Sequence, residues 1–205
     1  MSSDVAAPAP RRAPLDRWLK PAVFILCVIP LLWLPARFLI YGFGANPIET
    51  AIRYLGDWAL RFLLIALAVT PVRILTGWLP VARLRRMLGL FAFTYVALHV
   101  MAYVGLDQFF DWNAIGKDII KRTYITFGMI SLVILIPLAI TSTDKMLRRL
   151  GGARWRNLHR LVYVAGVAAV IHYYFMVKAG QLQPLIYGAI LAALFAVRIY
   201  NRFAR

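Results

Sequence analysis

The sequence predicts an all-α membrane protein, a bundle of about six transmembrane helices. Of its 205 residues, 62% are hydrophobic, whereas soluble domains contain about 45–50%. Six apolar runs each approach the roughly 20 residues that a helix needs to cross a bilayer. None of them alternates with a period of two, which excludes a β-barrel. The residues outside these runs suffice for loops and tails, but not for a separate soluble domain.

The six runs divide the chain into a tail and a membrane domain. Residues 1–20, rich in Ala, Pro and Arg, are predicted to form a disordered cytoplasmic tail, and residues 21–205 the membrane domain. The first run is too long for the hydrophobic region of a signal peptide, so we expect a retained helix, kinked at Pro30 and Pro35. We expect Arg61, near one end of the second run, to reach the interface. The runs cover about 21–41, 58–76, 87–105, 124–141, 157–177 and 184–200.

The net charge of +16 reflects basic residues that punctuate the apolar runs. A nucleic-acid surface would gather such residues on a soluble fold, so that class is disfavoured. Seventeen Lys and Arg fall on one side of the six spans and seven on the other. The positive-inside rule therefore predicts that both termini are cytoplasmic. The seven are Arg37, Arg53, Arg61, Lys117, Lys121, Arg122 and Lys178.

The single cysteine, Cys27, has no partner in the chain. Its isolation excludes an intrachain disulfide, a zinc or iron–sulfur site, and covalent haem attachment through C-x-x-C-H.

All three histidines lie in predicted helices, where ionisable groups are costly and usually functional. His99 is in the third run, and His159 and His172 are in the fifth. His99 lies 13 residues beyond Arg86, and His172 lies 13 residues beyond His159, a rise of about 20 Å along a helix. The equal depth of His99 and His172 makes them candidate axial ligands of one haem iron.

His159 has Arg86, not a histidine, at the same depth. A guanidinium stays protonated and is a poor iron ligand, so Arg86 is either a propionate partner or a residue that sets topology. A second haem at His159 is the weaker hypothesis. His159 and His172 also stand about 140° apart on an ideal helix, and a bulge near Gly166 is one way to reorient them.

Several segments together carry a resemblance to a known family. They are residues 85–90, 98–99, 141–143, 155–163, 171–173 and 183–187. In these segments the chain resembles the MsrQ (YedZ) family, the haem-binding membrane subunits of the periplasmic methionine sulfoxide reductase system. Residues 155–159 alone also fit the wider ferric-reductase-like transmembrane family.

The resemblance implies a multi-pass protein of the bacterial inner membrane, with residues 21–205 as a ferric-reductase-like haem-binding domain. It implies that b-type haem passes electrons to MsrP, a periplasmic molybdenum-cofactor enzyme that reduces methionine sulfoxide in proteins. The implied donors are quinones or a cytosolic flavin reductase, and FMN is a further implied cofactor. His99 and His172 carry over as ligands of one haem, and His159 as a ligand of a possible second. The wider family has two histidines on each helix, and Arg86 stands where the fourth would be.

The leading hypothesis is therefore an electron-transfer subunit whose partner performs the substrate reduction. The chain has no G-x-G-x-x-G that follows a strand, so electrons are expected to enter from another molecule. Three alternatives remain: a ferric-reductase-like cytochrome with another acceptor, a small proton-coupled transporter that uses the histidines as proton relays, and a purely structural assembly factor. A reducible cytochrome spectrum separates the transporter from the redox hypotheses.

Overall fold

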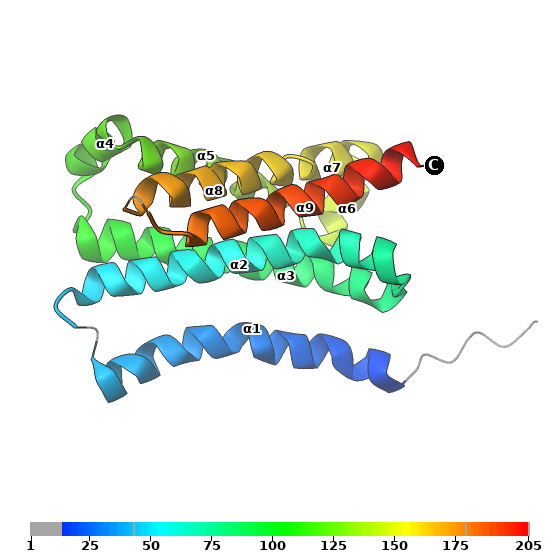
Figure 1. The fold of residues 1–205 in the computed structure, drawn as a ribbon, viewed down its shortest axis with the longest axis horizontal. Helices are drawn as coiled ribbons and strands as arrows, with labels where there is room; N and C mark the ends of the chain where they lie inside the picture. Colours follow the sequence, from blue (N-terminus) through cyan, green and yellow to red (C-terminus); the bar gives the residue numbers. More distant parts are fainter. Residues whose placement is uncertain (1–13, 43, 179, 205) are drawn as a thin grey trace, which may run out of the picture.

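The computed structural model describes residues 14–42, 44–178 and 180–204, and it shows a bundle of α-helices (Figure 1). Six of its helical segments are long and apolar enough to cross a membrane, which confirms the predicted fold class. These segments are Trp18–Tyr41, Pro47–Thr76, Leu79–Asp107, Thr123–Ile140, Gly152–Met176 and Gln183–Phe203.

Nine α-helices make up these spans and their connections within the described residues. A 3₁₀ helix, Leu79–Leu84, leads into α3, and a five-residue π-helix, Tyr103–Asp107, extends it. The α-helices are α1 (Pro14–Tyr41), α2 (Pro47–Thr76), α3 (Arg85–Ala102), α4 (Trp112–Lys121), α5 (Thr123–Ile140), α6 (Asp144–Leu150), α7 (Gly152–His159), α8 (Val162–Met176) and α9 (Gln183–Phe203).

The first helix begins at Pro14, inside the segment predicted as a tail, and residues 1–13 lie outside the described residues. The start of α1 and the C-terminal end of α9 lie at the same end of the bundle (Figure 1), as an even number of spans requires. We call this the α6–α7 end, and the opposite one the α4 end. Whether the α6–α7 end faces the cytoplasm stays a prediction.

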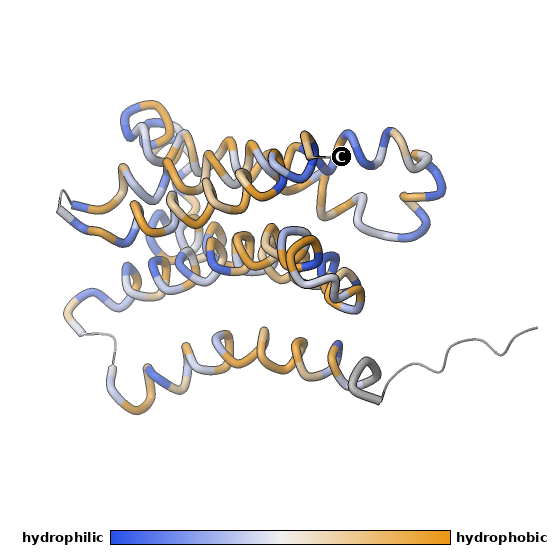
Figure 2. Tube along the Cα trace, turned by 45° about the vertical axis from the view of Figure 1, so that its right-hand side comes forward, coloured by the Kyte–Doolittle hydropathy of each residue, from blue (hydrophilic) through white to orange (hydrophobic). Residues whose placement is uncertain are grey.

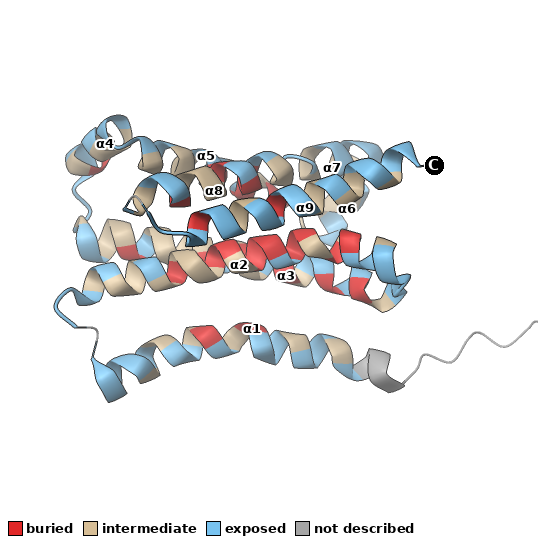
Figure 3. Cartoon of the chain, viewed as in Figure 1, coloured by how far each residue is buried: buried red, intermediate tan, exposed pale blue. Residues whose placement is uncertain are grey.

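Helix α2 is the central element of the bundle. Half of its most apolar window is buried, against 11–22% in the other five spans, and its middle is the most buried stretch in Figure 3. The side chain of Asn46 caps its first turn, Pro47 follows at a position where no N–H is needed, and Gly77 ends it at a φ of +68°. Because α2 starts well before residue 58, Arg61 lies near the middle of this span rather than near one end.

The middle stretches of the spans are predominantly hydrophobic, and hydrophilic residues gather toward their ends and in the connections (Figure 2). Large side chains such as Leu39, Ile65 and Val133 are exposed, an arrangement that suits lipid as the solvent. Helix α1 packs against the rest through Phe24 on Phe91 and through the Tyr95 hydroxyl, which donates to the Cys27 carbonyl at 2.9 Å.

Two local features differ from the sequence expectation. Helix α4 was not predicted; the Asp111 carboxylate caps it by accepting from two backbone N–H groups. The fifth span is broken between α7 and α8 at Arg160 and Leu161, where i→i−3 hydrogen bonds tighten the turn. The expected bulge near Gly166 is absent, because α8 runs through this residue without interruption.

Candidate functional site

The imidazole of His99 is held by helix α2. Its Nδ1 lies 2.8 Å from the carbonyl oxygen of Ile52, so it is Nδ1 that carries the proton and donates it. One turn further along α2 is Gly56, whose missing Cβ would stand 3.0 Å from the imidazole. Glycine at this position therefore lets the ring approach the backbone of α2.

The imidazole of His172 is held by helix α5 in the same way. Its Nδ1 lies 2.6 Å from the carbonyl oxygen of Tyr124, and a Cβ at Gly128 would stand 2.9 Å from the ring. In both cases the acceptor residue and the glycine are four positions apart on the neighbouring helix. The two histidines thus occupy equivalent settings in two helix pairs, α2 with α3 and α5 with α8.

The rings of His99 and His172 face each other, with centroids 6.3 Å apart and planes at 80°. Since both Nδ1 atoms donate to carbonyls, both Nε2 atoms keep a lone pair for a metal ion. Half of the 6.3 Å separation is about 3 Å, which accommodates a metal–nitrogen bond of about 2 Å and the distance from a nitrogen to its ring centre. The two rings that the sequence predicted to pair therefore lie at a spacing that suits imidazoles on either side of one metal ion.

No group of three His, Cys, Asp or Glu side chains that could hold a metal ion occurs in the part of the chain that the structure describes. A metal ion between His99 and His172 would take its remaining ligands from a bound group. Haem is such a group, because its macrocycle supplies four nitrogens and leaves two axial positions. The donor set and the spacing of the two rings both fit haem.

His159 lies near the α6–α7 end, in a different setting. Its Nε2 is 3.1 Å from the Thr141 hydroxyl, and its ring stacks on Trp155 at a centroid separation of 3.8 Å. Arg86 forms an ion pair with Asp144 at 2.6 Å. His159 and Arg86 line one cavity of about 230 Å³, smaller than the roughly 300–1,000 Å³ of sites that enclose drug-sized ligands. His159 is the only imidazole among the described residues that line this cavity, so no histidine pair like that of His99 and His172 occurs here.

The cavity beside His159 is strongly basic. Arg85, Arg86 and Arg198 line it together with Tyr163, and none of its described lining residues is acidic. It is suited to bind an anionic group at this end of the bundle.

Arg198 is fixed by a break in the hydrogen bonding of α2. Pro71 has no N–H to donate to the Leu67 carbonyl four residues earlier, and the Arg198 guanidinium donates to that oxygen instead. The same guanidinium donates to the Tyr163 hydroxyl at 2.8 Å, while its buried Nε–H has no partner in the described structure. A proline in α2 thus holds a cation of α9 at the wall of the cavity.

A polar cluster in the middle of the bundle was missed from the sequence. Arg61 donates to the Tyr187 hydroxyl at 3.0 Å and lies 4.9 Å from the centre of the Trp58 ring. Asp57 lies within electrostatic reach of Arg61 and of Tyr173, the neighbour of His172. The available signal is that the ionisable residues Asp57 and Arg61 are four positions apart. The predicted second apolar run starts at residue 58 and so leaves Asp57 outside the span.

Comparison with known proteins identifies the architecture. A family model described as "Ferric reductase like transmembrane component" matches residues 55–170, more than half of the chain. Several similar relatives are named "Protein-methionine-sulfoxide reductase heme-binding subunit MsrQ". The protein from Rhodospirillum rubrum is 59% identical over 184 residues, which cover 90% of this chain and 88% of the relative. That from Caulobacter vibrioides is 50% identical over 179 residues, 87% of this chain and 85% of the relative.

A relative of another name shows that this domain also occurs in longer proteins. "Magnetosome protein MamZ" of Magnetospirillum gryphiswaldense is 40% identical over 188 residues. The match covers 89% of this chain and 29% of that protein.

Proposed function

The chain belongs to the ferric-reductase-like transmembrane family and, within it, to the MsrQ subunits, and from this premise we propose that it is an electron-transfer subunit of a methionine sulfoxide reductase system. The observation that carries the proposal is the pairing of His99 with His172, with ring centroids 6.3 Å apart. A bound b-type haem supplies a one-electron carrier whose potential depends on its ligands and its burial.

The residues around the pair have separate tasks in this proposal. The carbonyls of Ile52 and Tyr124 fix the orientation and tautomer of the two imidazoles, as outer partners of metal-bound histidines do. Gly56 and Gly128 provide the space for the rings. The surrounding spans exclude water from the site, which favours binding of an apolar macrocycle.

We propose that electrons cross from the α6–α7 end to the α4 end. The basic cavity beside His159 and Arg198 suits an entry site, and the donor is a quinone or a cytosolic flavin reductase, with FMN as a further possible cofactor. The paired histidines lie nearer the α4 end, where the acceptor is a periplasmic molybdenum-cofactor enzyme similar to MsrP. Methionine sulfoxide in proteins is reduced on that partner, and the chain resides in a bacterial inner membrane.

The proposal contains one haem. A second would have His159 as its only imidazole, with Arg86 on the opposite wall, yet these side chains engage Thr141 and Asp144. We therefore assign His159 and Arg86 to the entry region, and the haem content per chain tests this assignment.

The deciding experiment is a reduced-minus-oxidised absorbance spectrum of the purified chain, with haem quantified per chain. We expect a b-type spectrum with one haem, lost in His99→Ala and in His172→Ala and retained in His159→Ala. A stoichiometry of two with loss of one haem in His159→Ala would establish a second site. A folded wild-type chain without haem would contradict the proposal and favour the transporter alternative.

A further inference from the structure

The α2 side of the histidine site carries an arginine on the same face of the helix as Gly56. Glu49, Arg53 and Gly56 are spaced i, i+4 and i+7, so they share one face of α2. Gly56 packs against the His99 ring on this face, and helical side chains point toward the N-terminus of their helix. Arg53 therefore reaches from the level of the ring toward the α4 end, where Glu49 holds its guanidinium at 2.6 Å.

The α5 side carries a second arginine in a similar position. Arg122 immediately precedes α5 and pairs with Asp118 of α4 at 3.2 Å. It also donates to the hydroxyl of Tyr124 at 3.2 Å, and the carbonyl of Tyr124 is the one that holds His172. The hydrogen bond with Tyr124 raises the pKa of Arg122 further, so its charge is permanent.

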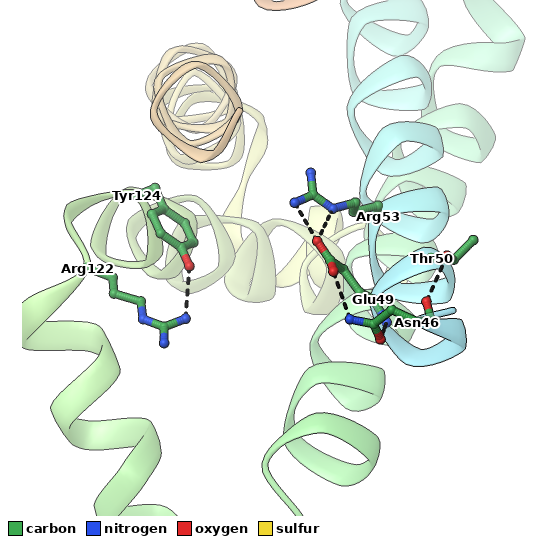
Figure 4. A network of polar contacts seen from close by, with 6 residues as sticks. All are labelled: Asn46, Glu49, Thr50, Arg53, Arg122 and Tyr124. Atoms are coloured by element: carbon green, nitrogen blue, oxygen red, sulfur yellow. Dashed lines mark hydrogen bonds and ion pairs between the residues drawn. The ribbon is translucent and has the colours of Figure 1, made fainter. Parts of the chain in front are cut away.

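The two arginines belong to the two helix pairs that hold the rings, Arg53 on α2 and Arg122 at the residue before α5. Figure 4 shows Arg53 with Glu49 and Asn46 on α2, and Arg122 with Tyr124 on a separate helical segment. Glu49 engages Nε and Nη2 of Arg53, and Asp118 and Tyr124 engage Nε and Nη1 of Arg122. One terminal nitrogen of each guanidinium, Nη1 of Arg53 and Nη2 of Arg122, has no partner among the described residues. Both guanidiniums are thus oriented in advance and keep donors for another anion.

We infer that Arg53 and Arg122 form a clamp for the two carboxylate groups of the haem, one from each helix pair. The inference rests on the proposed function, because it assigns the acidic groups of the proposed haem to named residues. Haem b carries two propionates on one edge, and the inference places that edge toward the α4 end, where Arg53 and Arg122 would hold it. Arginine suits this task because its planar fork matches a carboxylate.

Two neighbouring cations, Lys117 and Arg61, do not meet this description. Lys117 is exposed on α4, and within the described residues its side chain forms no hydrogen bond or ion pair with the residues that hold the two rings. Arg61 lies further along α2 than Gly56, away from the α4 end, and its guanidinium contacts Tyr187 and Trp58. Lys117 is therefore a matched control, because its removal changes the charge of the same end while Arg53 and Arg122 stay in place.

The test compares haem b with its dimethyl ester, in which both propionates are uncharged, in the full-length chain. We expect Arg53→Gln and Arg122→Gln each to lower the midpoint potential and to speed haem release severalfold, since uncompensated propionates favour the ferric state. Arg53→Lys and Arg122→Lys should recover part of both losses. Lys117→Gln should leave both quantities near wild type.

The ester distinguishes the clamp from a general effect of charge. Wild-type chain loaded with the ester should release it faster than haem b, and the two Gln substitutions should cause no further change. Equal shifts with haem b and with the ester, or an equal shift in Lys117→Gln, would overturn the clamp. A wild-type chain that binds neither porphyrin would instead contradict the proposed function itself.

Discussion

At the scale of single residues, the candidate site depends on two glycines as much as on two histidines. Each imidazole donates to a carbonyl at position i of the neighbouring helix, and the residue at i+4 is glycine. That carbonyl would ordinarily accept from the N–H of the same glycine, so the ring has to approach the helix closely to share it. Only a residue without a side chain permits this approach.

We predict that Gly56→Ala and Gly128→Ala displace the rings, because the added Cβ would stand 3.0 and 2.9 Å from imidazole atoms. Loss of an orienting contact of this kind typically weakens metal binding by about 10–100-fold. The haem content and the reduced spectrum of each variant measure the effect. Gly188→Ala is the control, since its Cβ would meet Val170 at an ordinary 3.7 Å. Full haem binding in both variants would contradict the assigned role of the glycines.

At the scale of helices, broken or extended elements place the polar groups. The tight turn at Arg160 and Leu161 separates α7 from α8, and residues wound as a 3₁₀ helix rotate by about 120° each instead of 100°. His159 can thereby face the basic cavity while His172 faces His99. Proline has a similar effect in α2, where Pro71 frees the Leu67 carbonyl for Arg198 of α9.

We predict an energetic coupling between Pro71 and Arg198. Arg198→Met leaves the buried Leu67 carbonyl without a donor, which should lower the free energy of unfolding by about 1–3 kcal/mol. In the Pro71→Ala background the backbone N–H of residue 71 supplies the donor, so the same substitution should cost less. A double-mutant cycle on thermal unfolding in detergent measures the difference. Strict additivity of the two changes would show that Arg198 does not replace the missing bond.

At the scale of the whole molecule, α2 lies at the centre and the polar groups of the bundle meet around it. The paired histidines lie on one side of α2 toward the α4 end, and the basic cavity lies toward the α6–α7 end. The cluster of Asp57, Arg61, Tyr173 and Tyr187 joins α2 to α8 and α9 between them. The strong excess of Lys and Arg at the α6–α7 end gives the bundle a defined direction in the membrane.

We predict that the α4 end faces the periplasm. In a Cys27→Ala background, Lys117→Cys should react with a membrane-impermeant maleimide added to intact spheroplasts. Lys145→Cys, in the first turn of α6, should react only after the membrane is opened. The reverse labelling pattern would contradict the positive-inside assignment and, with it, the proposed direction of electron transfer.

Hydropathy and residue spacing alone determined the membrane class, the six spans and the matched depth of His99 and His172. These properties follow from position along the chain, because lipid selects for local apolar length and a helix rises by a constant amount per residue. Only the tertiary structure decided that these two rings meet, that Gly56 and Gly128 admit them, and that His159 turns to Thr141 instead. It also moved Arg61 into the middle of a span and joined Arg198 to Leu67. Such contacts depend on how helices rotate and pack against one another, and neither the rotation nor the partner is encoded in a local stretch of sequence.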